Sequence, residues 1–167
     1  EAAAATLFTD LARQVQSNDP RRINDAAAVM MEKYASSGYA TRTALLAAQV
    51  NIQAKDVAPA KRQLQWVIEH AQEAALKDVA RLKLASLLLD EKDYAAALMQ
   101  LNAAHPEAFN GLYADLKGDV LSAQGKTAEA RVAYREAYAK TDAESMYRNL
   151  IQMKLDGLGE DPQGVKK

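Results

Sequence analysis

The amino-acid sequence predicts an all-α fold, a solenoid in which antiparallel helix pairs stack one on the next. A segment that begins with a turn, passes through an alanine and ends on a large apolar residue occurs three times, around Ala60, Ala97 and Ala130. These alanines are 37 and 33 residues apart, and such a period is typical of helix pairs that bury their apolar faces only by stacking. Glycine and proline are scarce, with 7 and 4 copies, whereas alanine, the strongest helix former, is abundant.

The composition excludes several classes of protein. A chain of 167 residues with 49% apolar content is long enough for one domain with a core and too apolar to be disordered. The 21 basic and 22 acidic residues nearly balance, and no dense cluster of lysine and arginine is present to contact phosphates, so nucleic acid is excluded as a ligand. Cysteine is absent, which leaves neither a disulfide framework nor a thiolate metal site.

The apolar periodicity and the turn residues predict about nine helices. They run over residues 2–17, 20–34, 39–54, 57–71, 75–89, 94–103, 107–124, 127–139 and 142–155. Consecutive helices are expected to form four antiparallel pairs, over residues 2–35, 39–71, 75–103 and 107–139.

The last predicted helix has no partner and is expected to cap the stack, because an uncovered end would expose an apolar face. Residues 158–167, which include Gly159, Pro162 and Gly164, cannot continue this helix and are predicted to form a flexible tail, so that the predicted domain covers residues 1–157. The side chains of the cap that should be buried are Met146, Leu150, Ile151 and Leu155.

Helix starts are marked by capping residues. Asp19 before Pro20 combines a good N-cap with a proline at the first helical position, where its missing amide hydrogen costs nothing. Asp56 and Asp93 are the expected N-caps of the second helix in the first two copies. The third copy has Lys126 at this place and is expected to use Thr127 instead.

Small residues recur where the two helices of each pair should cross. Ala48, Ala85 and Gly118 are equivalent crossing points, and large apolar residues surround them in the second and third copies. The first copy departs from this pattern, because Asn51 stands where a large apolar residue is usual. The spacing within each copy resembles the tetratricopeptide repeat.

A more specific resemblance covers residues 1–157. The segments that carry it are Tyr113–Asp119 (YADLKGD), Gly125–Arg131 (GKTAEAR) and the closing helix Met146–Leu155 with its Gln-Met-Lys sequence. In these segments the chain resembles the YfgM family, whose members are ancillary subunits of the bacterial SecYEG translocon.

The resemblance implies a periplasmic domain of a single-pass protein of the bacterial inner membrane, with an N-terminal membrane anchor upstream of the given sequence. It implies the SecYEG translocon and the periplasmic chaperone PpiD as partners, and unfolded secretory proteins as further ligands. A cytoplasmic adaptor scaffold would share every feature of the fold and stays the alternative. A membrane-spanning helix upstream would distinguish the two, because only the translocon subunit needs one.

Catalysis finds no support in the sequence, so no enzyme, cofactor or metal site is predicted. The only histidines are His70 and His105, and neither has a cysteine or a pair of carboxylates close by in sequence. A structural role is expected for both. Trp66 is predicted to lie in the core, because tryptophan buries a large area.

Protein binding is predicted on the first helix of each pair, because those helices form the inner wall of a curved stack. Counting from the three crossing points gives four positions on each helix. These predicted inner-wall residues are Arg42, Leu45, Gln49, Ile52, Val79, Leu82, Ser86, Leu89, Leu112, Asp115, Asp119 and Ser122.

Overall fold

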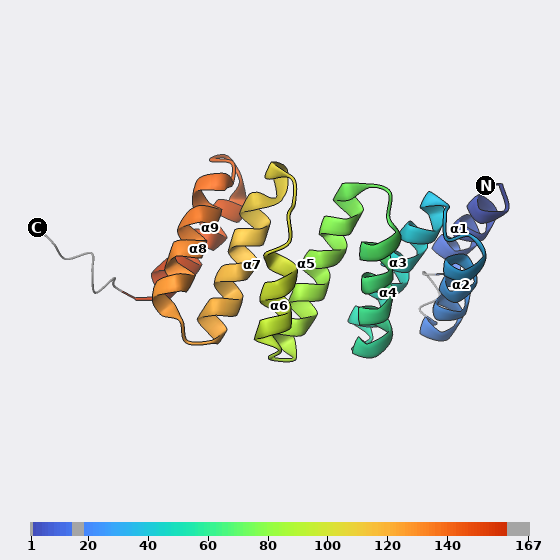
Figure 1. The fold of residues 1–167 in the computed structure, drawn as a ribbon, viewed down its shortest axis with the longest axis horizontal. Coiled ribbons are helices and arrows are strands. Elements are labelled where there is room, and N and C mark those ends of the chain that lie inside the picture. Colours follow the sequence, from blue (N-terminus) through green and yellow to red (C-terminus); the bar gives the residue numbers. More distant parts are fainter. Residues whose placement is uncertain (1, 15–18, 160–167) are drawn as a thin grey trace, which may run out of the picture. The chain divides into compact units, whose positions relative to one another are not determined.

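The fold is all-α, as predicted, in the computed structural model, which describes residues 2–14 and 19–159. No strand occurs in these two ranges (Figure 1). The helices are α1 (Ala2–Gln14), α2 (Pro20–Lys33), α3 (Gly38–Gln53), α4 (Val57–His70), α5 (Ala74–Asp90), α6 (Tyr94–Leu101), α7 (Asn110–Ala123), α8 (Thr127–Lys140) and α9 (Met146–Gly157), with a 3-10 turn, η2 (Glu107–Phe109), before α7. The chain divides into two compact units, Glu1–Leu87 and Leu88–Lys167.

The first unit is built around α3. This helix packs against both α2 and α4, and α1 contacts both α2 and α3. Alanines at the contacts let the helix backbones approach closely, and larger side chains fill the remaining space. One buried cluster, formed by α1, α2 and α3, consists of Leu11, Ile23, Ala27, Ala47 and Val50.

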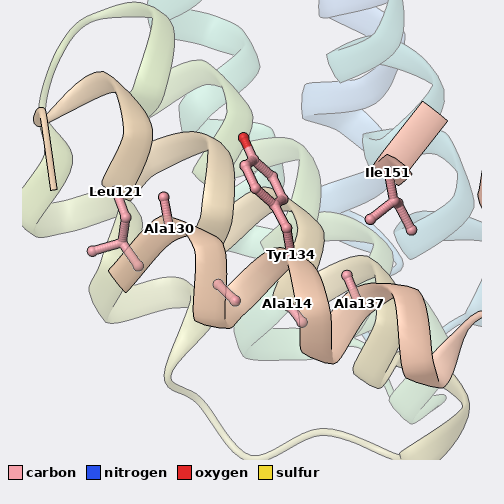
Figure 2. Packing of buried hydrophobic residues seen from close by; sticks show 7 residues of the cluster. Ala114, Leu121, Ala130, Tyr134, Ala137 and Ile151 are labelled. Atoms are coloured by element: carbon pink, nitrogen blue, oxygen red, sulfur yellow. The ribbon is translucent and has the colours of Figure 1, made fainter. Parts of the chain in front are cut away.

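The second unit is built around the antiparallel pair α7 and α8, against which α9 packs (Figure 1). Tyr134 of α8 lies among alanines of both helices, and Ile151 reaches the same core from α9 (Figure 2). The ring of Tyr134 fits because Gly118 of α7 has no side chain: a Cβ there would lie 2.4 Å from the ring atom Cδ1. The predicted crossing point of the third copy is therefore a close helix contact.

The cap helix differs from its prediction in both start and orientation. It begins at Met146 rather than residue 142, because the preceding residues form a turn and Ser145 caps the helix by accepting from the Tyr147 amide at 3.2 Å. Ile151 is buried and Leu155 half-buried, but Met146 and Leu150 are 87% and 45% exposed, so the prediction for these two was wrong.

Two polar side chains explain this orientation of α9. Tyr147 and Lys154 lie on the same face as Ile151, at positions i−4 and i+3, and both bind an aspartate of α7. Their contacts turn Met146, Leu150 and Met153 outward. The chain continues its packing to Leu158, which contacts the core although it was expected in the tail. Residues 160–167, the rest of the predicted tail, lie outside the described residues, as do residues 15–17 of the first predicted helix.

The helix caps agree with the predictions in part. Asp19 accepts a hydrogen bond from the Arg21 amide at 3.1 Å, and Asp93 accepts one from the Ala96 amide at 3.2 Å, which confirms both N-caps. Asp56 stands at the N-cap position of α4 but makes no capping hydrogen bond with its side chain. At α8 the cap position belongs to Lys126, and Thr127 is already helical, so its prediction as a cap was wrong.

The three repeated turns share one backbone geometry. Lys55, Lys92 and Gly125 all have a positive φ, of 60°, 62° and 75°. The amide that follows each of them donates to the carbonyl five residues before it, at 2.8, 2.8 and 2.9 Å. This is the Schellman ending of a helix, in which a residue in the left-handed region satisfies the last free carbonyls. The sequence repeat is thus also a repeat of backbone conformation.

Exchanging the residues at these turns tests the backbone strain directly. A lysine in the left-handed region costs roughly 1 kcal/mol relative to glycine, so Lys55→Gly and Lys92→Gly should each stabilise the fold by about 0.5 kcal/mol after the entropy of glycine in the unfolded chain is counted. Gly125→Ala should destabilise it by about 1 kcal/mol through its φ alone, because a Cβ there meets no atom within 4 Å. Urea unfolding followed by circular dichroism measures all three. A loss of stability in Lys55→Gly would contradict this account.

Candidate functional site

The predicted inner-wall residues of the first unit lie along α3 and α5. Arg42, Leu45, Gln49 and Ile52 share one face of α3 by their spacing. Arg42 is exposed, and the other three are half-buried. Two polar contacts join this face to α5 and to the residue that precedes it. Arg42 Nη2 lies 2.7 Å from Oε1 of Glu73, just before α5, and Lys83 Nζ of α5 donates to Gln49 Oε1 at 2.7 Å.

On α5, Val79 and Leu82 are half-buried and Ser86 is exposed. The first unit therefore carries partly accessible apolar side chains beside polar ones on both helices. A surface of this kind suits another protein better than a small molecule, because its groups are spread along helices rather than gathered in one cavity. The accessible apolar side chains of this surface are Leu45, Ile52, Val79 and Leu82.

In the second unit the predicted residues separate into two groups. Leu89 and Ser122 are half-buried, and Leu112 is 41% exposed. Asp115 and Asp119, in contrast, are engaged by α9 within the chain. Asp115 is only 4% exposed, so α9 occupies the place where the sequence predicted a partner at this residue.

The contact between α7 and α9 is a network of charged and aromatic side chains. Lys154 Nζ donates to both carboxylate oxygens of Asp115, at 2.9 and 2.8 Å, and to Asp119 Oδ2 at 2.9 Å. The hydroxyl of Tyr134 donates to Asp119 Oδ1 at 2.7 Å, and that of Tyr147 donates to Asp115 Oδ2. Both carboxylates are thus satisfied by groups of the chain itself, and the network holds α9 in place.

The network changes the proton affinity of its members. Burial raises the pKa of the Tyr134 hydroxyl well above the ordinary value of about 10, and the hydrogen bond and charge of Asp119 raise it further. Burial and then Asp115 act in the same way on the pKa of Tyr147. Burial alone would lower the pKa of Lys154, but the hydrogen bonds and charges of Asp115 and Asp119 outweigh it and raise that pKa.

These shifts predict a loss of stability at alkaline pH. Since the folded-state pKa of Tyr134, Tyr147 and Lys154 lies above the unfolded value, the folded state holds more protons than the unfolded state above about pH 10. The free energy of unfolding should be unaffected by these groups up to about pH 9 and should fall as the pH rises further. Circular dichroism and tyrosinate absorbance, recorded together, should show tyrosine ionisation accompanied by unfolding. Ionisation of every tyrosine with full retention of helix would contradict the prediction.

The structure also contains a cleft that the sequence did not reveal. It has a volume of about 660 Å³ and lies between α2 and α4, and its walls include Asn24, Met31, Arg62, Gln63 and Trp66. None of the twelve predicted inner-wall residues lines it. The available signal was Asn51, a polar residue at an apolar position of the repeat, because its buried amide bonds to two residues of this cleft.

Trp66 itself is half-buried rather than fully buried. It packs against the core cluster of Ala4, Met30 and Ala40 and stacks on His70 with the ring centroids 4.4 Å apart. Its prediction as a core residue is therefore correct for one part of the side chain, while another part lines the cleft.

Both histidines make local contacts of a structural kind. His70 Nδ1 lies 2.9 Å from the Trp66 carbonyl oxygen, and His105 Nδ1 lies 2.8 Å from that of Ala103. His105 also stacks on Tyr113 at 3.7 Å between ring centroids. Across residues 2–14 and 19–159 no three side chains are placed to bind a metal ion. Within the same ranges, no helix combines the length and apolar character needed to cross a membrane.

Comparison with known proteins assigns this chain to a family. The family described as Tetratricopeptide repeat-like domain matches residues 1–160. A protein of Neisseria gonorrhoeae named Ancillary SecYEG translocon subunit is 32% identical over 93% of this chain and 75% of its own length. Proteins with the same name from Escherichia coli and Aggregatibacter actinomycetemcomitans are 31% and 25% identical, over 76% and 84% of this chain and 63% and 68% of their own lengths.

No solved structure matches the chain. The family match spans both units, and the similarity to the Neisseria protein extends over nearly the whole sequence. The helical fold agrees with the description of the family, and the resemblance drawn from the sequence is confirmed. The chain therefore belongs to the tetratricopeptide repeat-like family that includes the ancillary SecYEG translocon subunits, the YfgM family.

Proposed function

We propose that this chain is the protein-binding domain of an ancillary SecYEG translocon subunit and catalyses no reaction. The observation that carries the proposal is the shared name of its relatives from three bacteria, one of them 32% identical over 93% of the chain. An interaction role suits the half-exposed side chains of α3 and α5, because repeat folds of stacked helices use such extended surfaces to bind other proteins.

The proposal includes a location and partners. The domain lies in the periplasm, is held to the inner membrane by an N-terminal helix, and meets SecYEG together with the chaperone PpiD. It handles secretory proteins as they emerge. The surface on α3 and α5 favours this role, since an unfolded chain offers apolar side chains that Leu45, Ile52, Val79 and Leu82 can contact.

Site-specific photo-crosslinking in bacterial cells tests the proposal. A photoreactive amino acid is placed at Leu82 or Leu112 in the full-length protein, and captured proteins are identified by mass spectrometry. Val29 serves as the matched control, because it is 39% exposed, close to the 41% of Leu112, but belongs to α2, which carries none of the predicted inner-wall residues. SecY, PpiD or nascent secretory chains should be captured from Leu82 and Leu112 and not from Val29.

Two other outcomes would reject the proposed location or the proposed binding surface. Capture of cytosolic proteins alone would favour the cytoplasmic adaptor. Equal capture of SecY from Val29 and from the two test positions would reject the inner wall as the binding surface while leaving the association with the translocon in place.

A further inference from the structure

The cleft between α2 and α4 is lined by side chains whose hydrogen-bond donors are not all used within the described part of the chain. Its base is a cluster of three carboxamides from three helices: Asn24 of α2, Asn51 of α3 and Gln63 of α4. Asn51 is fully buried and Gln63 is 7% exposed, whereas Asn24 is half-buried. Asn24 and Gln63 line the cleft, and Asn51 lies behind them.

Counting the side-chain N–H groups of this cluster shows which donors have no acceptor. Three carboxamides carry six N–H donors. Asn51 Nδ2 uses both of its own, toward Asn24 Oδ1 at 2.7 Å and Gln63 Oε1 at 2.8 Å. Asn24 Nδ2 uses one toward Asn51 Oδ1 at 3.1 Å, and Gln63 Nε2 uses one toward Asn24 Oδ1 at 2.8 Å.

One N–H therefore remains on Asn24 and one on Gln63, without an acceptor among residues 2–14 and 19–159. Both belong to residues that line the cleft, and their amides are held in orientation by the bonds to Asn51. Donors fixed in this way favour an acceptor such as a peptide carbonyl or a carboxylate, because no rotamer entropy is lost on binding.

The remaining walls specify the ligand further. Arg62 is exposed beside Gln63 and makes no ion pair within the described part of the chain. Trp66 follows one helical turn later and, with Met31 and Pro59, gives an apolar wall. Asp56 lines the cleft at the N-terminal end of α4, at the other end of the helix from Trp66. Its negative charge would repel a ligand with several acidic residues in a row.

From these observations we propose that the α2–α4 cleft binds an extended peptide segment with a single acidic residue next to an aromatic or large apolar one. The carboxylate pairs with Arg62, backbone carbonyls accept from Asn24 and Gln63, and the apolar side chain packs on Trp66. A volume of about 660 Å³ lies within the usual range of ligand clefts, about 300 to 1,000 Å³. This site is separate from the predicted inner wall and does not depend on association with the translocon.

The chain has a single tryptophan, Trp66, and it lines this cleft, so its fluorescence can be used to follow binding there. The protein of residues 1–167 is titrated with pools of hexapeptides. Each peptide carries a central Phe-Asp pair, in either order, between random flanking residues. Parallel pools replace the Asp by Asn or Lys. The Asp pools should shift the Trp66 emission and the side-chain amide resonances of Asn24 and Gln63, with an affinity about tenfold above that of the Lys pools.

Charge-reversal variants show whether the effect comes from this cleft. Arg62→Glu should weaken binding of the Asp pools at least about tenfold and improve that of the Lys pools. Arg21→Glu is the matched control: it makes the same change in charge at an exposed residue of α2 that does not line the cleft, and should leave both affinities unchanged.

Three results would overturn the proposal. They are the absence of any binding at roughly millimolar peptide, equal binding of the Asp and Lys pools, and an equal loss in Arg62→Glu and Arg21→Glu. Circular dichroism of both variants must match the parent protein, and since both side chains are exposed we expect this. Loss of crosslinking to SecY in cells would bear on the translocon proposal and not on this one.

Discussion

Replacing Gly118 by alanine is expected to destabilise the second unit by about 2 kcal/mol. The new Cβ would lie 2.4 Å from two ring atoms of Tyr134 and 3.0 Å from a third, closer than atoms can approach without a shift. The ring cannot turn aside freely, because it is 4% exposed and its hydroxyl is bound to Asp119. Overpacking of a core costs about 1 to 3 kcal/mol or more, which outweighs the gain of about 1 kcal/mol in helix propensity.

Urea unfolding measures this effect, and two further variants assign it to the ring. Gly157→Ala is the control, because a Cβ there meets no atom within 4 Å and stability should stay the same or rise slightly. Combining Gly118→Ala with Tyr134→Ala should give a strong favourable coupling, since removal of the ring removes the clash. If Gly118→Ala is as harmless as Gly157→Ala, the close contact between α7 and α8 is not as described.

The second large effect is expected from Lys154→Met, which keeps most of the side-chain length and removes the charge. Asp115 would then remain buried without its cation, and Asp119 would add a like charge nearby. Removing one partner of a buried ion pair costs about 3 to 5 kcal/mol. Lys154 is 25% exposed, so solvent compensates in part, and we expect a loss of about 2 to 3 kcal/mol.

Lys140→Met is the matched control, because Lys140 pairs with Glu107 at 3.9 Å and both side chains are exposed. Loss of this ion pair should lower the free energy of unfolding by less than about 0.5 kcal/mol. In the Lys154→Met background, Asp115→Asn should recover part of the lost stability by removing the unpaired charge. Chemical denaturation at neutral pH provides the free energies. Equal stability of the two lysine variants would show that the network does not hold α9.

The fold could be predicted from the sequence because its signals are local and repeat. The turns at Lys55, Lys92 and Gly125 stand at equivalent places of the three copies, and alanines mark the helix contacts. The orientation of α9 could not be predicted in this way. Its sequence offers two apolar stripes, one through Met146 and one through Ile151, and hydropathy alone does not choose between them.

The choice is made by polar side chains that meet only in the folded unit. Lys154 turns inward because Asp115 and Asp119 lie opposite it, and nothing in the local sequence shows that these aspartates face α9. The α2–α4 cleft was missed for the same reason. Asn24, Asn51 and Gln63 come from three different helices, and only Asn51, as a polar residue at an apolar place, gave a sign of it.

The outward stripe of α9 has a chemical consequence. Met146 and Met153 are 87% and 69% exposed and Met99 is 67% exposed, whereas Met30 is enclosed in the core. Peroxide would convert the three accessible thioethers to sulfoxides first, and the added polarity would fall on surface that already meets water. The chain has no thiol to oxidise. Oxidation of these three exposed methionines therefore disturbs the packing of the core least. Their side chains can be oxidised, and reduced again, without unfolding of the chain.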